Sequence, residues 1–179
     1  MLSTAVALAA FVSGVAAWTL TEYVVHRWSM HGTLGPAVVE RGHRRHHGEP
    51  QRRPLASPLA VTAVIVLSTV VLPVIGARLA DAVGAAWCAG ALVGPGWGLA
   101  YLAYERVHFH SHFGVCTTSY GRWAQRRHLH HHFVDGTRNY NFAIPIWDVV
   151  FRTARPVPAD VDVAGWLERS AQASGAPPP

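Results

Sequence analysis

The sequence predicts an all-α protein: an integral membrane helical bundle with a cytoplasmic helical cap. Half of its 179 residues are hydrophobic and only 14% are charged, which is low for a soluble domain. The fifteen basic residues are all arginine, and long uncharged runs separate them. Such segregation is typical of membrane proteins. It disfavours a nucleic-acid partner, which would call for a more continuous basic surface.

Three uncharged runs are each long enough to cross a bilayer as a helix: residues 1–21, 54–77 and 82–104. At about 1.5 Å per residue, each run matches a hydrocarbon core of about 30 Å. The first run lacks the basic segment that opens a signal peptide, so we interpret it as a span. The sequence GPG at 94–96 is expected to kink or break the third run. Arg78 and Asp81 mark a short turn, which would make the second and third runs a helical hairpin.

Arginine also predicts the orientation. Six arginines lie between the first and second runs and eight follow the third, whereas the hairpin turn holds only Arg78. Because arginine-rich loops remain in the cytoplasm, both segments are expected on that side of a multi-pass protein. Every histidine lies in these two segments and none lies in a span. The two groups of histidines can therefore meet at one membrane face.

The twelve histidines form four boxes, HRWSMH at 26–31, HRRHH at 43–47, HFHSH at 108–112 and HLHHH at 128–132. Helical residues three and four apart share a face, and this rule selects most members of the last three boxes. His26 and His31 are five apart and are expected to reach inward from different heights. His110 and His130 point away from the shared faces and are predicted to lie at the surface or behind the ligands. The candidate metal ligands are His26, His31, His43, His46, His47, His108, His112, His128, His131 and His132.

Ten imidazoles are too many for one ion, which accepts about four to six ligands, and they suit two. Imidazole binds iron, zinc and copper, and the few nearby carboxylates argue for an almost all-histidine dinuclear centre. A nonspecific metal-scavenging tract would be contiguous and irregular rather than helically spaced. A metal transporter, the remote alternative, would place polar ligands within its spans, and these spans have none.

The boxes resemble the fatty acid hydroxylase superfamily of integral membrane enzymes, which includes fatty acid 2-hydroxylases, sterol desaturases and carotenoid hydroxylases. The pattern H-x3–4-H, H-x2-HH, H-x3-H, H-x2-HH is met across roughly residues 20–155. EYVVHRWSMH at 22–31, YERVHFHSHFG at 104–114 and NYNFAIPIWDVVFRT at 139–153 are most similar to the 2-hydroxylase branch. GHRRHHGEP at 42–50 is equally similar to the carotenoid hydroxylases. Glu105 stands where the 2-hydroxylase branch usually has aspartate.

The resemblance implies an O2-dependent lipid hydroxylase. Two iron ions, which zinc can replace, would supply the oxidising chemistry at an unactivated C–H bond. A fatty acyl chain from the bilayer is the first expected substrate. A carotenoid hydroxylase and a sterol desaturase-type enzyme are the alternatives. Among carboxylates, Glu105 and Asp148 are candidates for orienting the ligand rings, and Trp147 is expected to pack at the membrane interface.

The reaction needs two electrons, and the sequence has no nucleotide-binding, iron–sulfur or haem motif. A separate donor is therefore expected, either a ferredoxin or a cytochrome b5-like protein with its reductase. Arg122, Arg126 and Arg127 form a candidate docking surface for an acidic carrier. Contact of these arginines with anionic lipid headgroups is the alternative.

Two regions are expected along the chain. Residues 1–155 would form the membrane-embedded catalytic domain. Residues 156–179 would form a tail with a short surface helix around 161–173 and a disordered end, SGAPPP.

Overall fold

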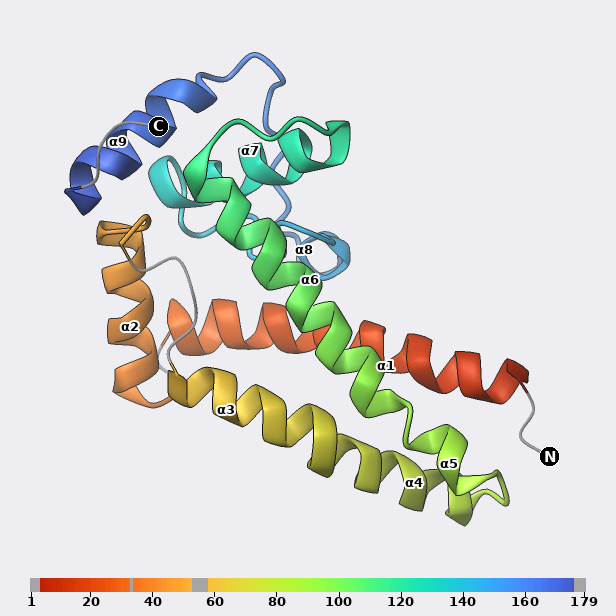
Figure 1. The fold of residues 1–179 in the computed structure, drawn as a ribbon. Coiled ribbons are helices and arrows are strands. Elements are labelled where there is room, and N and C mark those ends of the chain that lie inside the picture. Colours follow the sequence, from red (N-terminus) through yellow and green to blue (C-terminus); the bar gives the residue numbers. More distant parts are fainter. Residues whose placement is uncertain (1–3, 33, 53–57, 176–179) are drawn as a thin grey trace. The chain divides into compact units, whose positions relative to one another are not determined.

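The computed structural model describes residues 4–32, 34–52 and 58–175, and this part of the chain contains helices and no strand (Figure 1). The all-α class is therefore confirmed. The chain divides into two compact units. The apolar unit comprises Met1–Leu20 and Ala56–Ala103, and the histidine unit comprises Thr21–Leu55 and Tyr104–Pro179.

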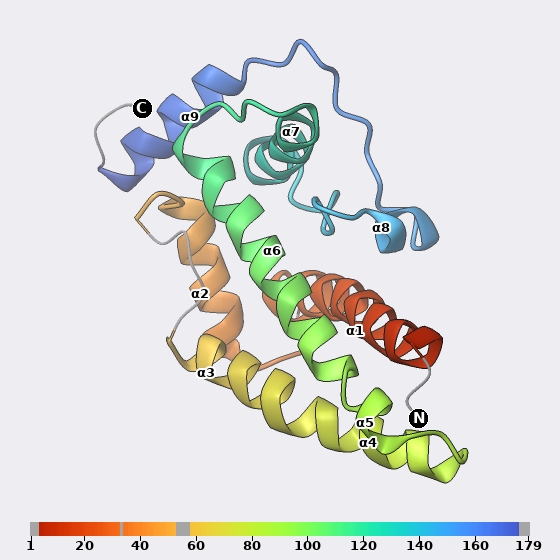
Figure 2. The same ribbon diagram turned by 45° about the vertical axis from the view of Figure 1, so that its right-hand side comes forward.

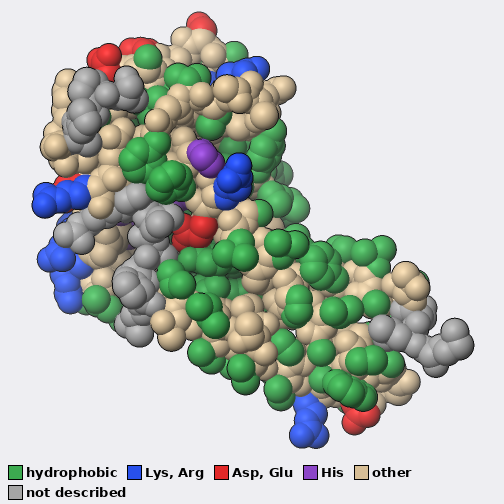
Figure 3. All heavy atoms as spheres, in the orientation of Figure 1, with side chains coloured by type: hydrophobic (Ala, Val, Ile, Leu, Met, Phe, Trp, Pro, Cys, Tyr) green, Lys and Arg blue, Asp and Glu red, His purple; other side chains and the backbone are tan. Residues whose placement is uncertain are grey.

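The apolar unit holds most of α1 (Thr4–Val24), then α3 (Pro58–Val66), the π-helix η2 (Leu67–Val71), α4 (Leu72–Ala82), α5 (Trp87–Gly90) and the start of α6 (Val93–Phe113). Two helical stretches in the described residues are long and apolar enough to cross a membrane, Thr4–Met30 and Ala60–Ala82. Only 17% and 11% of their most apolar windows are buried, so they are not core helices of a water-soluble fold. Hydrophobic side chains cover the face over α3 and α4 in Figure 3. These features are those of a membrane protein.

The third predicted span differs from the expectation. Its helical part is interrupted at residues 91–92, between α5 and α6, rather than at the GPG sequence. Pro95 lies in the first turn of α6, where a missing backbone N–H costs nothing. Arg78 and Asp81 lie inside α4, and the turn of the hairpin follows it at residues 83–86. Gly84 adopts a φ of 70° there, which suits glycine.

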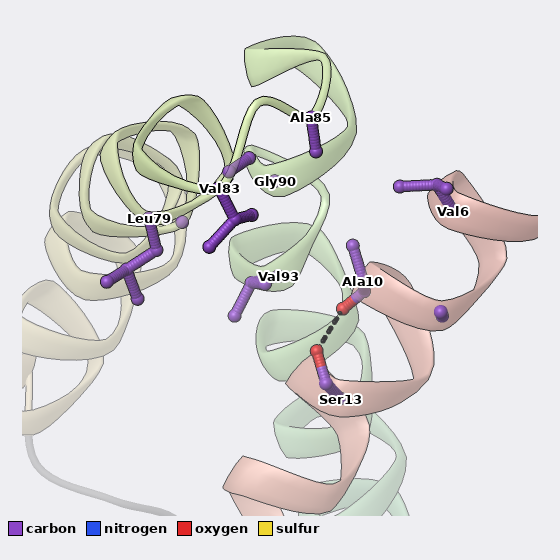
Figure 4. A pocket seen from close by; sticks show the side chains of 11 residues that line it. Val6, Ala10, Ser13, Leu79, Val83, Ala85, Gly90 and Val93 are labelled. Carbon is purple, nitrogen blue, oxygen red and sulfur yellow. Dashed lines mark hydrogen bonds between the residues drawn. The ribbon is translucent and has the colours of Figure 1, made fainter. Parts of the chain in front are cut away.

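Glycine brings the helices of the apolar unit into backbone contact. A Cβ atom on Gly76 would collide with the carbonyl oxygen of Gly90, and one on Gly14 would collide with that of Val93. Such small residues are typical of helix packing in membranes. Near these contacts a groove of about 440 Å³ opens between α1, α4 and α5. It is lined by apolar side chains, and the hydroxyl of Ser13 in its wall donates to Ala10 O of its own helix at 2.7 Å (Figure 4).

The histidine unit holds the π-helix η1 (Val25–Met30), α2 (Ala37–Gly48), the end of α6, α7 (Ser119–Phe133), α8 (Ile146–Val150) and α9 (Val163–Ser174). Thr118 caps α7 and Asp162 caps α9, each by accepting a backbone N–H of the first turn. Figures 1 and 2 show α9 beside α7. The predicted tail helix is therefore not a loose surface element, because its Trp166 and Leu167 pack on Leu129 of α7. Residues 176–179 of the predicted disordered end lie outside the described part.

Candidate metal centre

A π-turn sets the first pair of candidate ligands. His26 lies in η1, and the backbone N–H of His31 donates to the carbonyl oxygen of His26 at 3.1 Å, an i→i+5 bond. Residues five apart are then about one turn apart and share a face. The ring centroids of His26 and His31 are 5.1 Å apart. The rings therefore share a face, one turn apart along the helix, rather than standing about 140° apart as α-helical geometry would place them.

Helices α2, α6 and α7 supply the other ligands from faces that converge. The ten predicted histidines form two clusters, and within each cluster one ligand atom per residue lies within 4.8 Å of all the others. The α2 and α7 helices contribute to both clusters. The first cluster is His26, His31, His43, His47 and His131, and the second cluster is His46, His108, His112, His128 and His132.

The two remaining histidines belong to neither cluster. His110 is exposed on α6. His130 is 9% exposed on α7, so it lies behind the ligands rather than at the surface. The histidines that point away from the shared helix faces are thus separated from the clusters, as the spacing predicts.

In the first cluster, the Nε2 atom of His43 has more Nε2 neighbours than a hydrogen-bond network allows. The Nε2 atom of His43 is 3.1 Å from that of His26, 2.9 Å from that of His31 and 3.0 Å from that of His47. A neutral ring nitrogen carries either one proton or one lone pair, so it cannot form three such bonds. In the second cluster, the Nε2 atoms of His46 and His108 are 3.1 Å apart. This is the arrangement of donor atoms around a common cation.

The spacing of the nitrogens also favours particular ligand angles. Metal–imidazole bonds of about 2.0–2.1 Å place two nitrogens about 2.9 Å apart at right angles and about 3.3 Å apart in a tetrahedron. Six Nε2–Nε2 distances in the two clusters run from 2.8 to 3.1 Å. They match right-angled ligand sets with up to five imidazoles each. Both clusters could therefore hold a metal ion.

Burial keeps seven of the cluster imidazoles neutral at physiological pH. Burial lowers the pKa of His31 to about 4, and burial with the neighbouring imidazoles lowers the pKa of His47 to about 2. The same causes, burial first, hold the pKa of His43, His112, His128, His131 and His132 well below the ordinary value. Neutral rings leave lone pairs available for a metal.

Backbone carbonyl groups orient two rings of the first cluster. Nδ1 of His26 donates to the carbonyl oxygen of Tyr140 at 2.7 Å, and Nδ1 of His131 donates to that of Arg138 at 2.7 Å. A ring whose Nδ1 carries the proton presents the Nε2 lone pair, as metal ligation requires. In the second cluster, Nδ1 of His108, His112, His128 and His132 has no hydrogen-bond partner among the described residues. The two clusters are therefore supported differently.

The two predicted carboxylates take different places. Glu105 lies three residues before His108, and its Oε2 is 3.9 Å from His108 Nδ1, too long for a hydrogen bond. Asp148 is fully buried, yet its carboxylate bonds to Tyr140 N, Asn141 N, Thr153 Oγ1 and Arg127 NH2 rather than to a histidine. Trp147 packs near Phe151, with ring centroids 6.3 Å apart.

The predicted arginine surface is smaller than expected. Arg127 is 6% exposed, because its guanidinium pairs with Asp148 at 3.1 Å and lies over the ring of Trp123. It is therefore not available for docking, which corrects the prediction. Arg122 is exposed and Arg126 is partly exposed.

Spacing rules did not identify every residue that contributes to the site. The carbonyl groups of Arg138 and Tyr140 carry no side-chain signal, so periodicity could not find them. Phe142 is fully buried, with its ring centroid 4.4 Å from that of His128. The only signal for Tyr140 and Phe142 was the resemblance over 139–153, and Arg138 lies just outside that stretch.

The two clusters are in contact through a pair of stacked imidazole rings. His47 of the first cluster and His132 of the second are stacked, with centroids 4.0 Å apart and planes inclined by 7°. Two metal ions held by these clusters would therefore be neighbours in one centre, rather than occupants of separate sites.

Comparison with known proteins agrees with this site. A family model described as "Fatty acid hydroxylase" matches residues 11–153. Fatty acid 2-hydroxylase of Rattus norvegicus is 30% identical over 161 residues, covering 84% of this chain and 40% of the rat protein. Dihydroceramide fatty acyl 2-hydroxylase FAH1 of Arabidopsis thaliana is 28% identical over 149 residues, covering 79% of this chain and 59% of the plant protein. The chain thus spans about half the length of these relatives.

A solved structure, "Full length scs7p (only hydroxylase domain visible)", is similar in fold. It has a TM-score of 0.62 and 24% sequence identity, and the similarity covers 89% of this chain and 59% of that chain. The relatives named above confirm the resemblance to the 2-hydroxylase branch. Since the family model covers most of the sequence, this chain belongs to the fatty acid hydroxylase family.

Proposed function

We propose that this chain is a membrane-bound di-iron oxygenase that hydroxylates a C–H bond of a lipid, with a fatty acyl chain as the substrate class. The observation that carries the proposal is the pair of five-histidine clusters with Nε2 atoms at ligand spacing. The names of the relatives, which include fatty acid and dihydroceramide fatty acyl 2-hydroxylases, support an acyl substrate.

Two iron ions fit the clusters best. Burial lowers the pKa of seven of the ten imidazoles and leaves their lone pairs available, and five imidazoles in each cluster exceed the four ligands of tetrahedral zinc. Five nitrogens leave room for a further ligand at an ion that takes about six. Iron so held would supply the O2-activating chemistry. Zinc could still occupy the clusters in a purified sample.

The chain's own residues would hold, orient and shield this centre. The carbonyl groups of Tyr140 and Arg138 fix two rings of the first cluster. Phe142 lies against His128, and Tyr104 stacks on His108 with centroids 5.7 Å apart. These aromatic rings keep water from the imidazoles, which favours oxidation of an apolar chain over side reactions.

Access to the bilayer supports a lipid substrate. The histidine unit exposes a patch of aliphatic side chains around α8, formed by Ile144, Ile146, Val149 and Val150. Exposed apolar patches of this kind mark membrane or ligand contact. We propose that this patch rests in the membrane interface, where an acyl chain could reach the centre.

The membrane arrangement follows from arginine placement. We propose a multi-pass protein with the histidine clusters on the cytoplasmic face, because arginine-rich segments carry every histidine. Residues 1–155 would form the catalytic domain, which agrees with the family match over residues 11–153. Residues 156–179 would add α9, whose packing on α7 supports the histidine unit from outside that domain.

Electrons would come from a separate carrier, a ferredoxin or a cytochrome b5-like protein with its reductase. Arg122 and Arg126 remain candidates for contact with an acidic carrier. Replacing the exposed Arg122 should lower the turnover rate more at a low concentration of carrier than at a saturating one. The metal content should stay unchanged.

Lipid mass spectrometry of cells with and without the gene tests the function. We expect an acyl lipid that gains one oxygen when the chain is expressed. His131→Ala should abolish this product because His131 belongs to the first cluster, whereas His110→Ala should spare it because His110 lies outside both. A product lacking two hydrogens, or an oxidised sterol or carotenoid, would replace the acyl hydroxylase with one of the alternatives.

A further inference from the structure

We propose that Asp148 is a positioning residue for the first cluster and sets that cluster's affinity for its metal ion, while leaving the second cluster unaffected. The proposal rests on the function proposed above for the two clusters. It assigns a selective role to a carboxylate that touches no histidine. Its basis is the set of hydrogen bonds by which Asp148 holds the backbone segment whose carbonyl groups bind His26 and His131.

Asp148 fixes the backbone of the segment 138–141. The side chain is fully buried, and its Oδ1 accepts from Tyr140 N at 3.0 Å while its Oδ2 accepts from Asn141 N at 2.9 Å. Two consecutive amide groups are thus held by the two oxygens of one carboxylate. The carbonyl group of Tyr140, between those amides, accepts the Nδ1 proton of His26.

Asn139 lies between the two residues whose carbonyl groups bind different histidines. Asn139 has a φ of 57°, in the left-handed region that asparagine tolerates better than most residues. The carbonyl groups on either side of it, those of Arg138 and Tyr140, bind His131 and His26 respectively. Asn139 N donates to Thr153 O at 3.1 Å, and Asn139 Oδ1 accepts from Arg155 N at 2.8 Å. An unusual backbone is therefore tied to the same region that contains Asp148.

Asp148 is also joined to the helices that carry His26 and His131. Thr153 Oγ1 donates its single proton to Asp148 Oδ1 at 2.7 Å, so it accepts from Tyr23 OH, which lies 3.0 Å away. Tyr23 lies three residues before His26. Arg127, four residues before His131, bonds to Asp148 Oδ2 at 3.1 Å. Asp148 thus supports His26 and His131 in two ways. It fixes the segment whose carbonyl groups accept their Nδ1 protons, and it bonds, directly or through Thr153, to a residue about one helical turn before each histidine.

Four histidines of the second cluster lack this support. Nδ1 of His108, His112, His128 and His132 has no hydrogen-bond partner in the described part of the chain. Disturbing segment 138–141 should therefore act on one cluster. Loss of a partner that orients a metal-bound histidine weakens metal binding by about 10–100-fold.

The test measures Zn²⁺ binding by the full chain in detergent, stripped of metal and titrated against a competing chelator. Wild-type protein should bind two ions. Asp148→Asn keeps the shape of the side chain but replaces one accepting oxygen with an NH2 group that faces a hydrogen-bond donor. The Zn²⁺ affinity of one site should therefore fall about 10–100-fold, and that of the other site should stay the same. Thr153→Val should lower the affinity of the same site by a smaller factor than Asp148→Asn does. Thr153→Ser, which keeps the hydroxyl, should have the wild-type affinity.

The control is Asp162→Ala, which removes the cap of α9 in the same unit without touching segment 138–141. It should lower thermal stability and leave both affinities unchanged. Two results would overturn the role of Asp148 without affecting the proposed di-metal function. One is that Asp148→Asn and Thr153→Val weaken both sites equally, and the other is that both variants keep the two wild-type affinities. A wild-type chain that binds no ion would overturn the proposed di-metal function as well.

Discussion

At the scale of single residues, the clusters bring together more ring nitrogens than hydrogen bonds among them can pair. Nε2 of His43 faces three other Nε2 atoms at 2.9–3.1 Å, and burial lowers the pKa of His43, so its ring is neutral at neutral pH. Without metal, at most one of these three contacts can be a hydrogen bond of that nitrogen. Metal binding should therefore contribute directly to the stability of the histidine unit.

The pH dependence of the metal-free protein follows from the same shifts. Burial lowers the pKa of His31 to about 4, whereas an unfolded histidine titrates near 6.5. Between those values the unfolded chain binds more protons than the folded chain, so stability falls as the pH decreases. Above pH about 6.5 both states are neutral and the stability is fully present. We expect the thermal midpoint of chelator-treated protein to be constant from pH 8 to 7 and to fall between pH 6.5 and 4.

Replacing the exposed His110 with glutamine should leave that profile unchanged, since this ring is in neither cluster. His47→Gln should flatten it, because the change removes a buried ring whose pKa is lowered to about 2. A midpoint that rises on acidification would contradict the neutral state of the clusters.

Helical spacing predicts the direction of a side chain without any knowledge of the fold. Positions i, i+3 and i+4 on α2, α6 and α7 put the candidate ligands on common faces and set His110 and His130 aside, and neither of these two is in a cluster. The sequence could not place Arg127, because its burial depends on Asp148, twenty-one positions later. Nor could it find the carbonyl partners of His26 and His131, because every residue has a backbone carbonyl group.

At the scale of elements, η1 accounts for the spacing of the first box. Counting 100° per residue puts His26 and His31 on different faces of an α-helix, and the sequence offered no sign of a wider turn. The i→i+5 bond from His31 N to His26 O adds one residue to the turn and restores the shared face. A five-residue spacing in a π-turn is thus equivalent to a four-residue spacing in an α-turn.

This equivalence predicts opposite effects of a deletion and an insertion at Ser29. Deleting Ser29 puts the two histidines four apart, which shares a face in an α-helix, so the first cluster should keep its ion. Inserting one alanine after Ser29 puts them six apart, about 120° around an α-helix and off the shared face, so one of two ions should be lost. Metal analysis of purified protein measures both.

Ser29→Ala is the matched control, because it removes only a hydroxyl whose bond to Leu34 O is exposed, and it leaves the register unchanged. Retention of two ions by the insertion variant would show that the π-turn does not set the geometry of this pair.

At the scale of the whole molecule, the chemistry and the apolar surface lie in different units. All twelve histidines fall in the histidine unit, while the apolar unit supplies the stretch Ala60–Ala82 with little of its surface buried. The sequence predicted this division because charge and histidine are excluded from the long apolar runs. It placed the break of the third run at the GPG sequence, whereas α5 ends at Gly90 and α6 begins at Val93.

If Ala60–Ala82 crosses the membrane, a charge at its centre should be far more costly than one at its end. Val70 is 55% exposed near the middle of the stretch, and Val83 is 80% exposed just beyond it. An arginine at the centre of a span costs about 2.5–3.5 kcal/mol, whereas one at the end reaches the headgroups. Val70→Arg should therefore reduce membrane insertion, measured with glycosylation acceptor sites placed on either side of the stretch. Val83→Arg should insert as the wild type does, and equal insertion of both variants would mean that Ala60–Ala82 does not span the bilayer.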